Sequence, residues 1–261
     1  MSRPVALVTG AGRGIGAATV AALCRDGWSV LAVDACEDDP QLGYGLASRD
    51  DLADVIALAG EHAKAVIADV RDPDALAAAV AQAEARWGGL DAAIACAGVI
   101  AGGRPQWELD PAVEKVVLDV GLGGVLNLAR AAVPALLRRP VPRHGRFLAV
   151  ASAAATRGLP QLAAYCAAKA GVAGLVRSLA VELAGTGVTA NAVSPGSTDT
   201  EMLAESARLY GLPLVETFAT QQPHGRLLDA AEIAAVLAFL AGPGASAMTG
   251  AIIPVDGGLA L

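Results

Sequence analysis

The stretch that decides the fold reads Thr-Gly-Ala-Gly-Arg-Gly-Ile-Gly and occupies residues 9–16. It lies between the apolar run of residues 5–8 and an Ala-rich segment of helical period at residues 15–26. Glycines at such a junction permit a tight turn and let the backbone approach a pyrophosphate, while the helix N-terminus supplies amide donors. A plain turn is the alternative, but the position between strand and helix favours a dinucleotide-binding loop. The loop residues expected to contact the dinucleotide are Gly10, Arg13, Gly14, Ile15 and Gly16.

Beyond this stretch, short apolar runs alternate with longer segments of helical period. The further strand candidates are residues 29–33, 65–68, 92–97, 146–151, 188–193 and 251–255. The further helix candidates are residues 74–86, 112–138, 163–184 and 231–241. The alternation predicts right-handed βαβ units and therefore an α/β fold, a Rossmann-like doubly wound parallel sheet of about seven strands with helices on both faces. We expect one domain over residues 1–261, because nothing resembles a linker or a repeat.

Composition excludes several classes of protein. Apolar residues make up 54% of the 261 residues and charged residues 17%, which excludes a disordered chain. The net charge of −7 argues against a nucleic-acid partner. Apolar runs end well before the ~20 residues of a membrane span, and the N-terminus does not resemble a signal peptide. Without paired spacing, the cysteines are expected to be reduced thiols in a cytoplasmic protein. They are Cys24, Cys36, Cys96 and Cys166.

Two segments interrupt the alternation. Residues 36–51 form a Gly-, Pro- and Asp-rich loop before a helix that Ser48 or Asp50 could cap. Residues 200–226 collect apolar side chains without a strand pattern, which fits either a surface loop or an apolar lid over a pocket.

Asp34 provides a second test of the dinucleotide site. It ends the second strand candidate, eighteen residues after Gly16, which matches the offset of a carboxylate that binds the adenosine ribose. A carboxylate there repels a 2′-phosphate and so predicts NAD rather than NADP. Arg13 is a contrary hint, since a cation in the loop could meet a phosphate, but one unpaired exposed Arg costs little. Asp69 could hold the adenine edge or act as a solvated strand-end carboxylate or helix cap.

Tyr165 and Lys169 are four residues apart on a predicted helix and share one face. An ammonium near a phenol lowers the phenol pKa, which makes Tyr165 a candidate general acid/base for an alcohol or carbonyl. Ser152, at the end of a strand candidate, could bind the same substrate oxygen. A serine hydrolase is disfavoured because Gly-x-Ser-x-Gly is absent, and a metal site because His and Cys lack ligand spacing.

Together these residues resemble the short-chain dehydrogenase/reductase family over nearly the whole chain. The matching positions, in order, are Thr9 to Gly16, Asp34, Ala97-Gly98, Ser152, Tyr165, Lys169, Asn191, Pro195-Gly196, Thr200 and Asp256-Gly257-Gly258. The resemblance implies hydride transfer between a nicotinamide and a carbinol carbon. It also implies a catalytic set of Ser152, Tyr165 and Lys169, in which Lys169 binds the nicotinamide ribose, and a homotetramer. The further cofactor-binding residues that it implies are Val70, Ala97, Gly98, Pro195, Gly196, Thr198 and Thr200.

Two departures from the family pattern matter. The family's Asn-Asn-Ala-Gly segment reads Ala95-Cys96-Ala97-Gly98 here, which loses side-chain amides that brace the central strands. The family's catalytic Asn, whose carbonyl holds a water of the proton relay, is replaced by Gly121. A glycine in a helix costs up to ~1 kcal/mol, so we expect a looser helix and a weakened relay.

The loop after Asp34 is longer than is usual for the family. Together with Cys36, Tyr44 and the Asp51-Leu52-Ala53 segment, it resembles the mycofactocin-associated branch. That branch implies a loop that covers a non-exchanging NAD, recycled by mycofactocin as an external redox partner.

We therefore expect an NAD-dependent dehydrogenase or ketone reductase for a medium-sized, mainly apolar alcohol. Two alternatives remain: a catalytically weak NAD-binding redox sensor, suggested by Gly121, and an NADP-type carbonyl reductase of acyl metabolism, which Asp34 disfavours.

Overall fold

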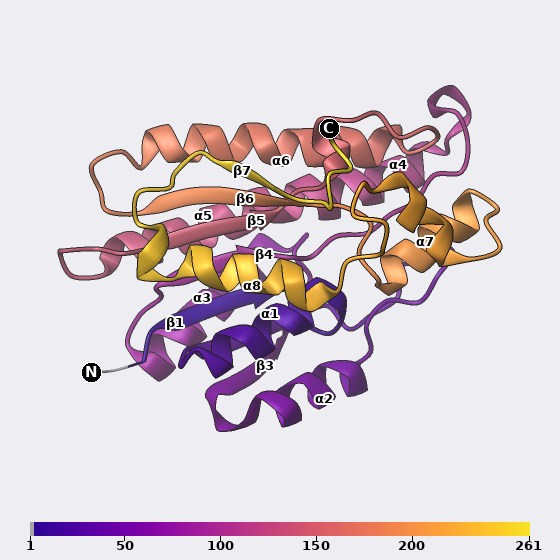
Figure 1. The fold of residues 1–261 in the computed structure, drawn as a ribbon. Coiled ribbons are helices and arrows are strands. Elements are labelled where there is room, and N and C mark those ends of the chain that lie inside the picture. Colours follow the sequence, from indigo (N-terminus) through magenta and orange to yellow (C-terminus); the bar gives the residue numbers. More distant parts are fainter. Residues whose placement is uncertain (1–2) are drawn as a thin grey trace.

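The computed structural model describes residues 3–261, and its centre is a parallel sheet of seven strands in the order β3-β2-β1-β4-β5-β6-β7 (Figure 1). Chain order and sheet order diverge between β1 and β4, where the ends of the strands leave a crevice for a ligand. The strands are β1 (Val5–Thr9), β2 (Ser29–Asp34), β3 (Ala63–Ile67), β4 (Ala92–Ala95), β5 (Arg146–Val150), β6 (Thr189–Pro195) and β7 (Ile252–Val255). The predicted Rossmann-like fold is confirmed.

Helices cover both faces of the sheet. They are α1 (Gly14–Arg25), α2 (Arg49–Ala59), α3 (Pro73–Trp87), α4 (Pro111–Leu118), α5 (Gly124–Arg138), α6 (Ala163–Glu182), α7 (Glu201–Leu209) and α8 (Ala230–Ala241). Buried residues of α1, α2 and α8 form one apolar core with the sheet, and those of α3, α5 and α6 form the other. Helix α7 lies apart from both layers, at the end of the sheet where the strands terminate (Figure 1).

The local sequence explains where the helices begin. Asp72 accepts hydrogen bonds from the Asp74 and Ala75 amides at the start of α3, and Asp110 accepts one from Ala112 at the start of α4. Ser48 forms a reciprocal cap with Asp51 at the start of α2, which decides between the two predicted caps. The predicted loop of residues 36–51 is therefore shorter at its C-terminal end.

The structure adds detail to two further segments. The helical stretch predicted for residues 112–138 is present and contains a π-helical turn, Asp119–Gly123, between α4 and α5. Residues 200–226, for which the sequence left a surface loop or an apolar lid open, contain α7 and the 3₁₀ helix η5 (Val215–Gln221).

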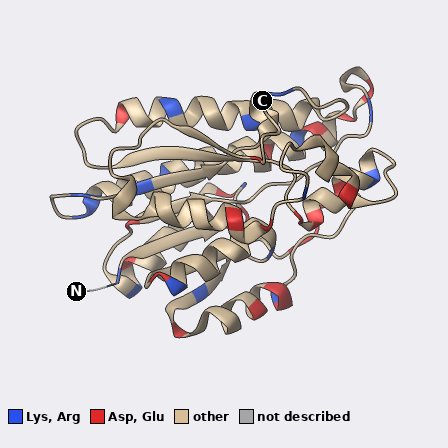
Figure 2. Cartoon of the chain, in the orientation of Figure 1, with Lys and Arg blue, Asp and Glu red and all other residues tan. Residues whose placement is uncertain are grey.

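Two helical stretches are, by length and composition alone, apolar enough to cross a membrane. They are Pro111–Arg138 and Ala163–Glu182. Both pack on the sheet, since Leu128 and Val172 are fully buried in the same core, and α6 carries charged side chains (Figure 2). Burial against the sheet explains their apolar composition, so we interpret them as core helices.

Candidate active site

The glycine loop turns sharply between β1 and α1. Gly10 has a φ of +64°, and a Cβ on it would lie 2.6 Å from Ala97 Cα, so the loop packs directly on the residues that follow β4. A Cβ on Gly16 would overlap the Gly10 carbonyl oxygen. Both positions therefore require glycine, because larger residues would move the loop away from β4 and α1.

The N-terminus of α1 suits an anion. Its N-cap residue, Arg13, makes no side-chain cap bond, and no acidic residue lies in the first turn. In contrast, α2 and α3 begin with capping side chains. Amides at the start of a helix need an acceptor, and a pyrophosphate satisfies them while interacting favourably with the helix dipole.

Asp34 stands at the end of β2 beside this loop. Its Oδ2 accepts a hydrogen bond from the Gly12 amide at 2.8 Å, and its Oδ1 accepts one from the Cys36 amide at 3.2 Å. These bonds hold the carboxylate at the cavity wall, where its remaining lone pairs can accept from ribose hydroxyls.

Arg13 is not unpaired, as the sequence suggested. Its Nη1 donates to the Gly45 carbonyl at 2.9 Å, and its guanidinium lies 5.9 Å from the centre of the Tyr44 ring. The side chain therefore binds the loop after β2. These contacts use part of the hydrogen-bonding capacity of the guanidinium, which leaves fewer donors for a phosphate.

Asp69 belongs to an ion-pair network. Arg71 donates to Asp69 Oδ2 from Nη2 at 2.6 Å and to Asp39 Oδ2 from Nη1 at 2.6 Å. Burial raises the pKa of Asp69, but hydrogen bonds from the Arg71 side chain and backbone outweigh it, so the net shift is downward. Asp69 is neither a free strand-end carboxylate nor the cap of α3, which is Asp72. Sequence reasoning missed Arg71 and Asp39.

The segment of residues 35–48, here called the N-terminal cover, folds over one end of the site. Tyr44 Oη accepts a hydrogen bond from the Ile100 amide at 3.0 Å, and Ala47 packs against Gly12. With the Arg13 and Arg71 contacts, this cover is held from the glycine loop, from the end of β3 and from the segment after β4.

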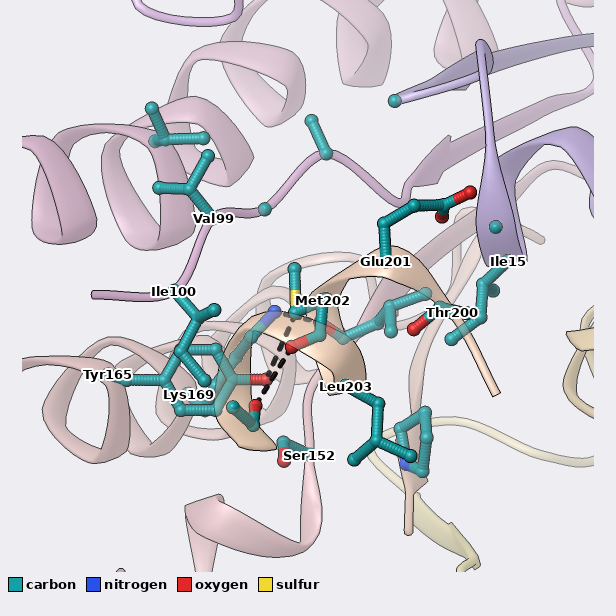
Figure 3. Close-up of a pocket in the computed structure, with 18 of the residues that line it drawn as sticks. Ile15, Val99, Ile100, Ser152, Tyr165, Lys169, Thr200, Glu201, Met202 and Leu203 are labelled. Carbon is teal, nitrogen blue, oxygen red and sulfur yellow. Dashed lines mark hydrogen bonds between the residues drawn. The ribbon is translucent and has the colours of Figure 1, made fainter. Parts of the chain in front are cut away.

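Ser152, Tyr165 and Lys169 lie close together in the same pocket (Figure 3). Ser152 follows β5 and caps a short 3₁₀ helix, Ala153–Ala155, through a bond from the Ala154 amide at 3.1 Å. Tyr165 and Lys169 lie on α6, both buried, with the Lys169 Nζ 5.7 Å from the centre of the Tyr165 ring. The three predicted catalytic residues are thus brought together.

The predicted lowering of the Tyr165 pKa was wrong for the chain itself. Burial raises the pKa of Tyr165 to about 12, and hydrogen bonding by the Ser152 side chain offsets only part of this. Burial also lowers the pKa of Lys169 to about 8. The Lys169 Nζ donates one hydrogen bond to the Val150 carbonyl at 2.8 Å, and among the described residues no hydrogen bond joins it to the Tyr165 hydroxyl. The chain therefore holds Tyr165 as a neutral phenol.

The turn after β6 completes the wall. Thr198 Oγ1 donates to the Gly196 carbonyl at 3.2 Å, and Thr200 Oγ1 donates to the Thr198 carbonyl at 3.2 Å. Gln222, which sequence reasoning missed, is buried beneath them and accepts from the Ser197 amide at 2.8 Å. Gln222 thereby fixes the backbone that carries Pro195, Gly196 and Thr198.

We expected Gly121 to loosen a regular helix, but the structure does not place it in one. It lies in the π-helical turn, is buried, and a Cβ on it would sit 3.2 Å from Ala168 Cβ. Glycine therefore lets this turn pack closely against α6 beside Lys169.

The segment of residues 200–221, here called the C-terminal cover, closes the catalytic end. Tyr210 Oη donates to the Pro160 carbonyl at 2.9 Å, and its ring packs edge-on against Phe218. The Tyr165 hydroxyl donates to Met202 Sδ at 3.9 Å (Figure 3). Among the large apolar residues of this segment, Leu209, Leu214 and Val215 do not line the cavity.

One cavity of about 630 Å³ connects both ends. All the predicted cofactor and catalytic residues line it: Gly10, Arg13, Gly14, Ile15, Gly16, Asp34, Asp69, Val70, Ala97, Gly98, Ser152, Tyr165, Lys169, Pro195, Gly196, Thr198 and Thr200. The lining also includes Glu37, Asp39, Leu42, Arg157 and Leu259, which sequence reasoning had not assigned to the site. A backbone loop suited to a dinucleotide thus shares one space with a buried tyrosine.

Comparisons with known proteins agree with this geometry. Residues 10–260 match a family model described as enoyl-(acyl carrier protein) reductase. The chain is 40% identical to cis-4-hydroxycyclohexanecarboxylate dehydrogenase of Sinomonas cyclohexanicum, over 97% of this chain and 95% of that protein. It is 34% identical to (-)-trans-carveol dehydrogenase of Rhodococcus erythropolis, over 98% and 97% respectively.

Among solved structures, carveol dehydrogenase from Mycobacterium avium in complex with NAD superposes with a TM-score of 0.93 at 30% identity. That match covers 99% of this chain and 98% of the other. The family model, the full-length relatives and the shared fold lead to one conclusion: this chain belongs to the short-chain dehydrogenase/reductase family of oxidoreductases.

Proposed function

We propose that this protein is an NAD-dependent dehydrogenase that interconverts a ring-bearing secondary alcohol and its ketone. One observation carries the proposal: the glycine loop, Asp34 and the Tyr165 hydroxyl line the same cavity. Two relatives are named for ring alcohols, which supports the substrate class. The apolar side chains of Met202, Leu212 and Phe218 in the cavity wall suit such a body.

The site fits NAD by its own construction. The uncapped N-terminus of α1 would receive the pyrophosphate, and the Asp34 carboxylate would accept from the adenosine ribose while repelling the 2′-phosphate of NADP. When bound, NAD would supply a nicotinamide ring that accepts a hydride from the carbinol carbon or returns it. Thr198, Thr200 and the Pro195-Gly196 turn would hold the carboxamide end.

The chain's own residues handle the proton. Because its pKa is raised to about 12, Tyr165 carries a proton near neutral pH and can give it to a ketone oxygen. In alcohol oxidation Tyr165 must first lose that proton. Ser152 would orient the substrate oxygen from the other side, and the buried Lys169 ammonium would favour the phenolate as charge develops.

We also propose that the protein belongs to the mycofactocin-associated branch and retains its NAD. The support is the N-terminal cover, which is tied to the rest of the site by Arg13, Arg71 and Tyr44. Such a cover would slow cofactor release, so an external redox partner, mycofactocin, would have to recycle the bound NAD.

A cytoplasmic homotetramer completes the proposal. Leu126 on α5, Val181 on α6 and Phe239 on α8 are large apolar side chains left exposed, which favours burial by further copies of the chain. The four cysteines are free thiols, which suits a reducing compartment.

A second candidate is reduction of acyl-carrier substrates, which the description of the matching family model favours. Asp34 opposes it where such a reaction uses NADP. The assembly of Ser152, Tyr165 and Lys169 in one cavity argues against a silent redox sensor, which has no need of them.

The test is oxidation of a panel of ring alcohols, 4-hydroxycyclohexanecarboxylate and carveol among them, by wild type and Tyr165→Phe, with an artificial electron acceptor present. Loss of the general acid/base should lower kcat by about 10²–10⁴-fold. Ketoacyl thioesters with NADPH form the comparison arm. Equal rates in wild type and variant would remove Tyr165 from the reaction, and turnover of the thioesters alone would favour the second candidate.

A further inference from the structure

The cavity wall around Tyr165 contains one unexplained charge. The catalytic end is lined by residues of the segment 152–165, by residues of the C-terminal cover after Glu201, and by Leu259. None of these described residues has an acidic side chain. Glu201 lies on the side of Ile15 and Thr200, toward the glycine loop (Figure 3). Arg157 is the single arginine among the described residues of this end, and the other cation, the Lys169 ammonium, lies beside the Tyr165 ring at the reacting hydroxyl.

Arg157 is positioned by the same short segment as Ser152. Ser152 caps the 3₁₀ helix Ala153–Ala155, and the Arg157 amide donates to the Ala153 carbonyl at 3.0 Å as the segment leaves it. The Arg157 Nη1 donates to the Leu259 carbonyl at 2.5 Å, which anchors the guanidinium to the C-terminal segment. A guanidinium has five N–H donors, so the contact with Leu259 leaves the others for a ligand.

The other arginines of the cavity are already engaged. Arg71 contacts two carboxylates, and Arg13 contacts a carbonyl and an aromatic ring. Arg157 makes no ion pair with any residue of the described chain 3–261. Arg157 is a solvent-exposed residue at the cavity wall, and in a chain of net charge −7 such a cation, without an ion-pair partner in the described chain, is available to an anion.

We propose that Arg157 binds a carboxylate at the end of the substrate remote from the reacting hydroxyl. This inference rests on the proposed function, because it takes Tyr165 as the site of the alcohol. Leu159, Leu162 and Phe218 line the wall as well, which suits an apolar body between hydroxyl and carboxylate. One planar guanidinium matches one carboxylate in a two-bond fork, and the other cation of this end among the described residues, Lys169, lies at the Tyr165 ring rather than beside Arg157 for a shared phosphate.

The first experiment compares two substrates in three variants. The kcat/KM is measured for 4-hydroxycyclohexanecarboxylate and for its methyl ester, which differ in the charge remote from the alcohol. Arg157→Gln should lower the acid-to-ester ratio of kcat/KM by about tenfold, through KM rather than kcat. Arg157→Lys should retain most of the ratio. Arg104→Gln, an equal charge change outside the cavity, should leave the ratio as in wild type. An equal loss for acid and ester in Arg157→Gln would overturn the anchor.

The second experiment does not depend on turnover. Isothermal titration calorimetry with NAD⁺ present measures binding of cyclohexanecarboxylate and of its neutral amide, both of which lack the reacting hydroxyl. Wild type should bind the carboxylate about tenfold more tightly than Arg157→Gln does, with a smaller difference for the amide. Carboxylate binding that depends on Arg157 in a protein that oxidises no alcohol would sink the proposed function and leave the anchor standing. If the protein oxidises ring alcohols but wild type and Arg157→Gln bind the carboxylate equally well, the proposed function stands and the Arg157 anchor is refuted.

Discussion

The two covers of the cavity are built in different ways. The N-terminal cover adds polar contacts of fixed geometry to the apolar packing of Leu42: Arg71 bonds Asp39, Arg13 donates to the Gly45 carbonyl, and Tyr44 accepts from the Ile100 amide. The C-terminal cover is held mainly by apolar packing around Phe218 and Met202, and the Tyr210 hydroxyl also donates to the Pro160 carbonyl. The covers touch where Arg208 approaches Gly43.

This difference suits two ligands of different kinds. Directional bonds lose their strength when partners move by a fraction of an ångström, so the N-terminal cover favours a single closed position. Apolar contacts tolerate rearrangement, and a methionine adapts its shape more easily than other side chains. The N-terminal cover therefore suits a cofactor of fixed shape, and the C-terminal cover suits substrates of varying shape.

The largest effect on NAD affinity should come from a substitution in the glycine loop. Gly16→Ala would place a Cβ on the Gly10 carbonyl and force the loop away from α1. Overpacking of this kind costs about 1–3 kcal/mol, which corresponds to an NAD affinity about 100-fold weaker at the upper end. Isothermal titration calorimetry measures the affinity. Gly174→Ala on α6, where a Cβ meets no atom within 4 Å, is the matched control and should bind as wild type does.

The stability of the catalytic end should respond to pH. The Lys169 pKa falls from 10.5 to about 8 on folding, because burial disfavours the ammonium. Between these values the folded protein binds fewer protons than the unfolded chain, so stability rises with pH, whereas below about pH 8 the full penalty is present. From pH 7 to pH 9.5 the unfolding free energy of wild type should rise relative to Lys169→Met by about 2 kcal/mol. Urea unfolding at both pH values measures it, and parallel pH profiles of the two proteins would refute the assignment.

A smaller effect, on the rate of NAD release, should distinguish the N-terminal cover from the C-terminal cover. Asp39→Asn removes a carboxylate whose side chain is 8% exposed from its contact with Arg71. Loss of a partly exposed charge-assisted bond costs about 1 kcal/mol, so bound NAD should dissociate about fivefold faster. Stopped-flow fluorescence of NADH release measures the rate.

Two controls sharpen that comparison. Glu84→Gln breaks the Arg138 ion pair away from the cavity with the same change of charge and should leave the NADH release rate unaltered. Met202→Leu, in the other cover, should change the KM of the alcohol but not the release of NADH. A release rate that responds to Met202→Leu as strongly as to Asp39→Asn would mean that the covers act as one.

Much of the cofactor end could be predicted from sequence, since it is encoded by local pattern. Gly10 and Gly16 must be glycine at a strand-helix junction, and Asp34 has a fixed offset from them. The Arg71–Asp39 pair could not be found this way, because two residues 32 apart meet only through the path of an irregular loop. The Tyr165 pKa was mispredicted because helical spacing reports that Lys169 shares its face but not how deeply both are buried. Arg157 could not be predicted as a site residue, because a single arginine after a turn is common and only the folded structure shows that it lines the cavity.

The central claim is that one bound dinucleotide reaches from the start of α1 to Tyr165, and a crystal structure of the protein with NAD⁺ tests it most directly. We predict the pyrophosphate at the Gly14 end of α1, the adenosine ribose hydroxyls on the Asp34 carboxylate, and the nicotinamide beside the Tyr165 hydroxyl. A dinucleotide bound elsewhere, or one whose nicotinamide points away from Tyr165, would contradict the account.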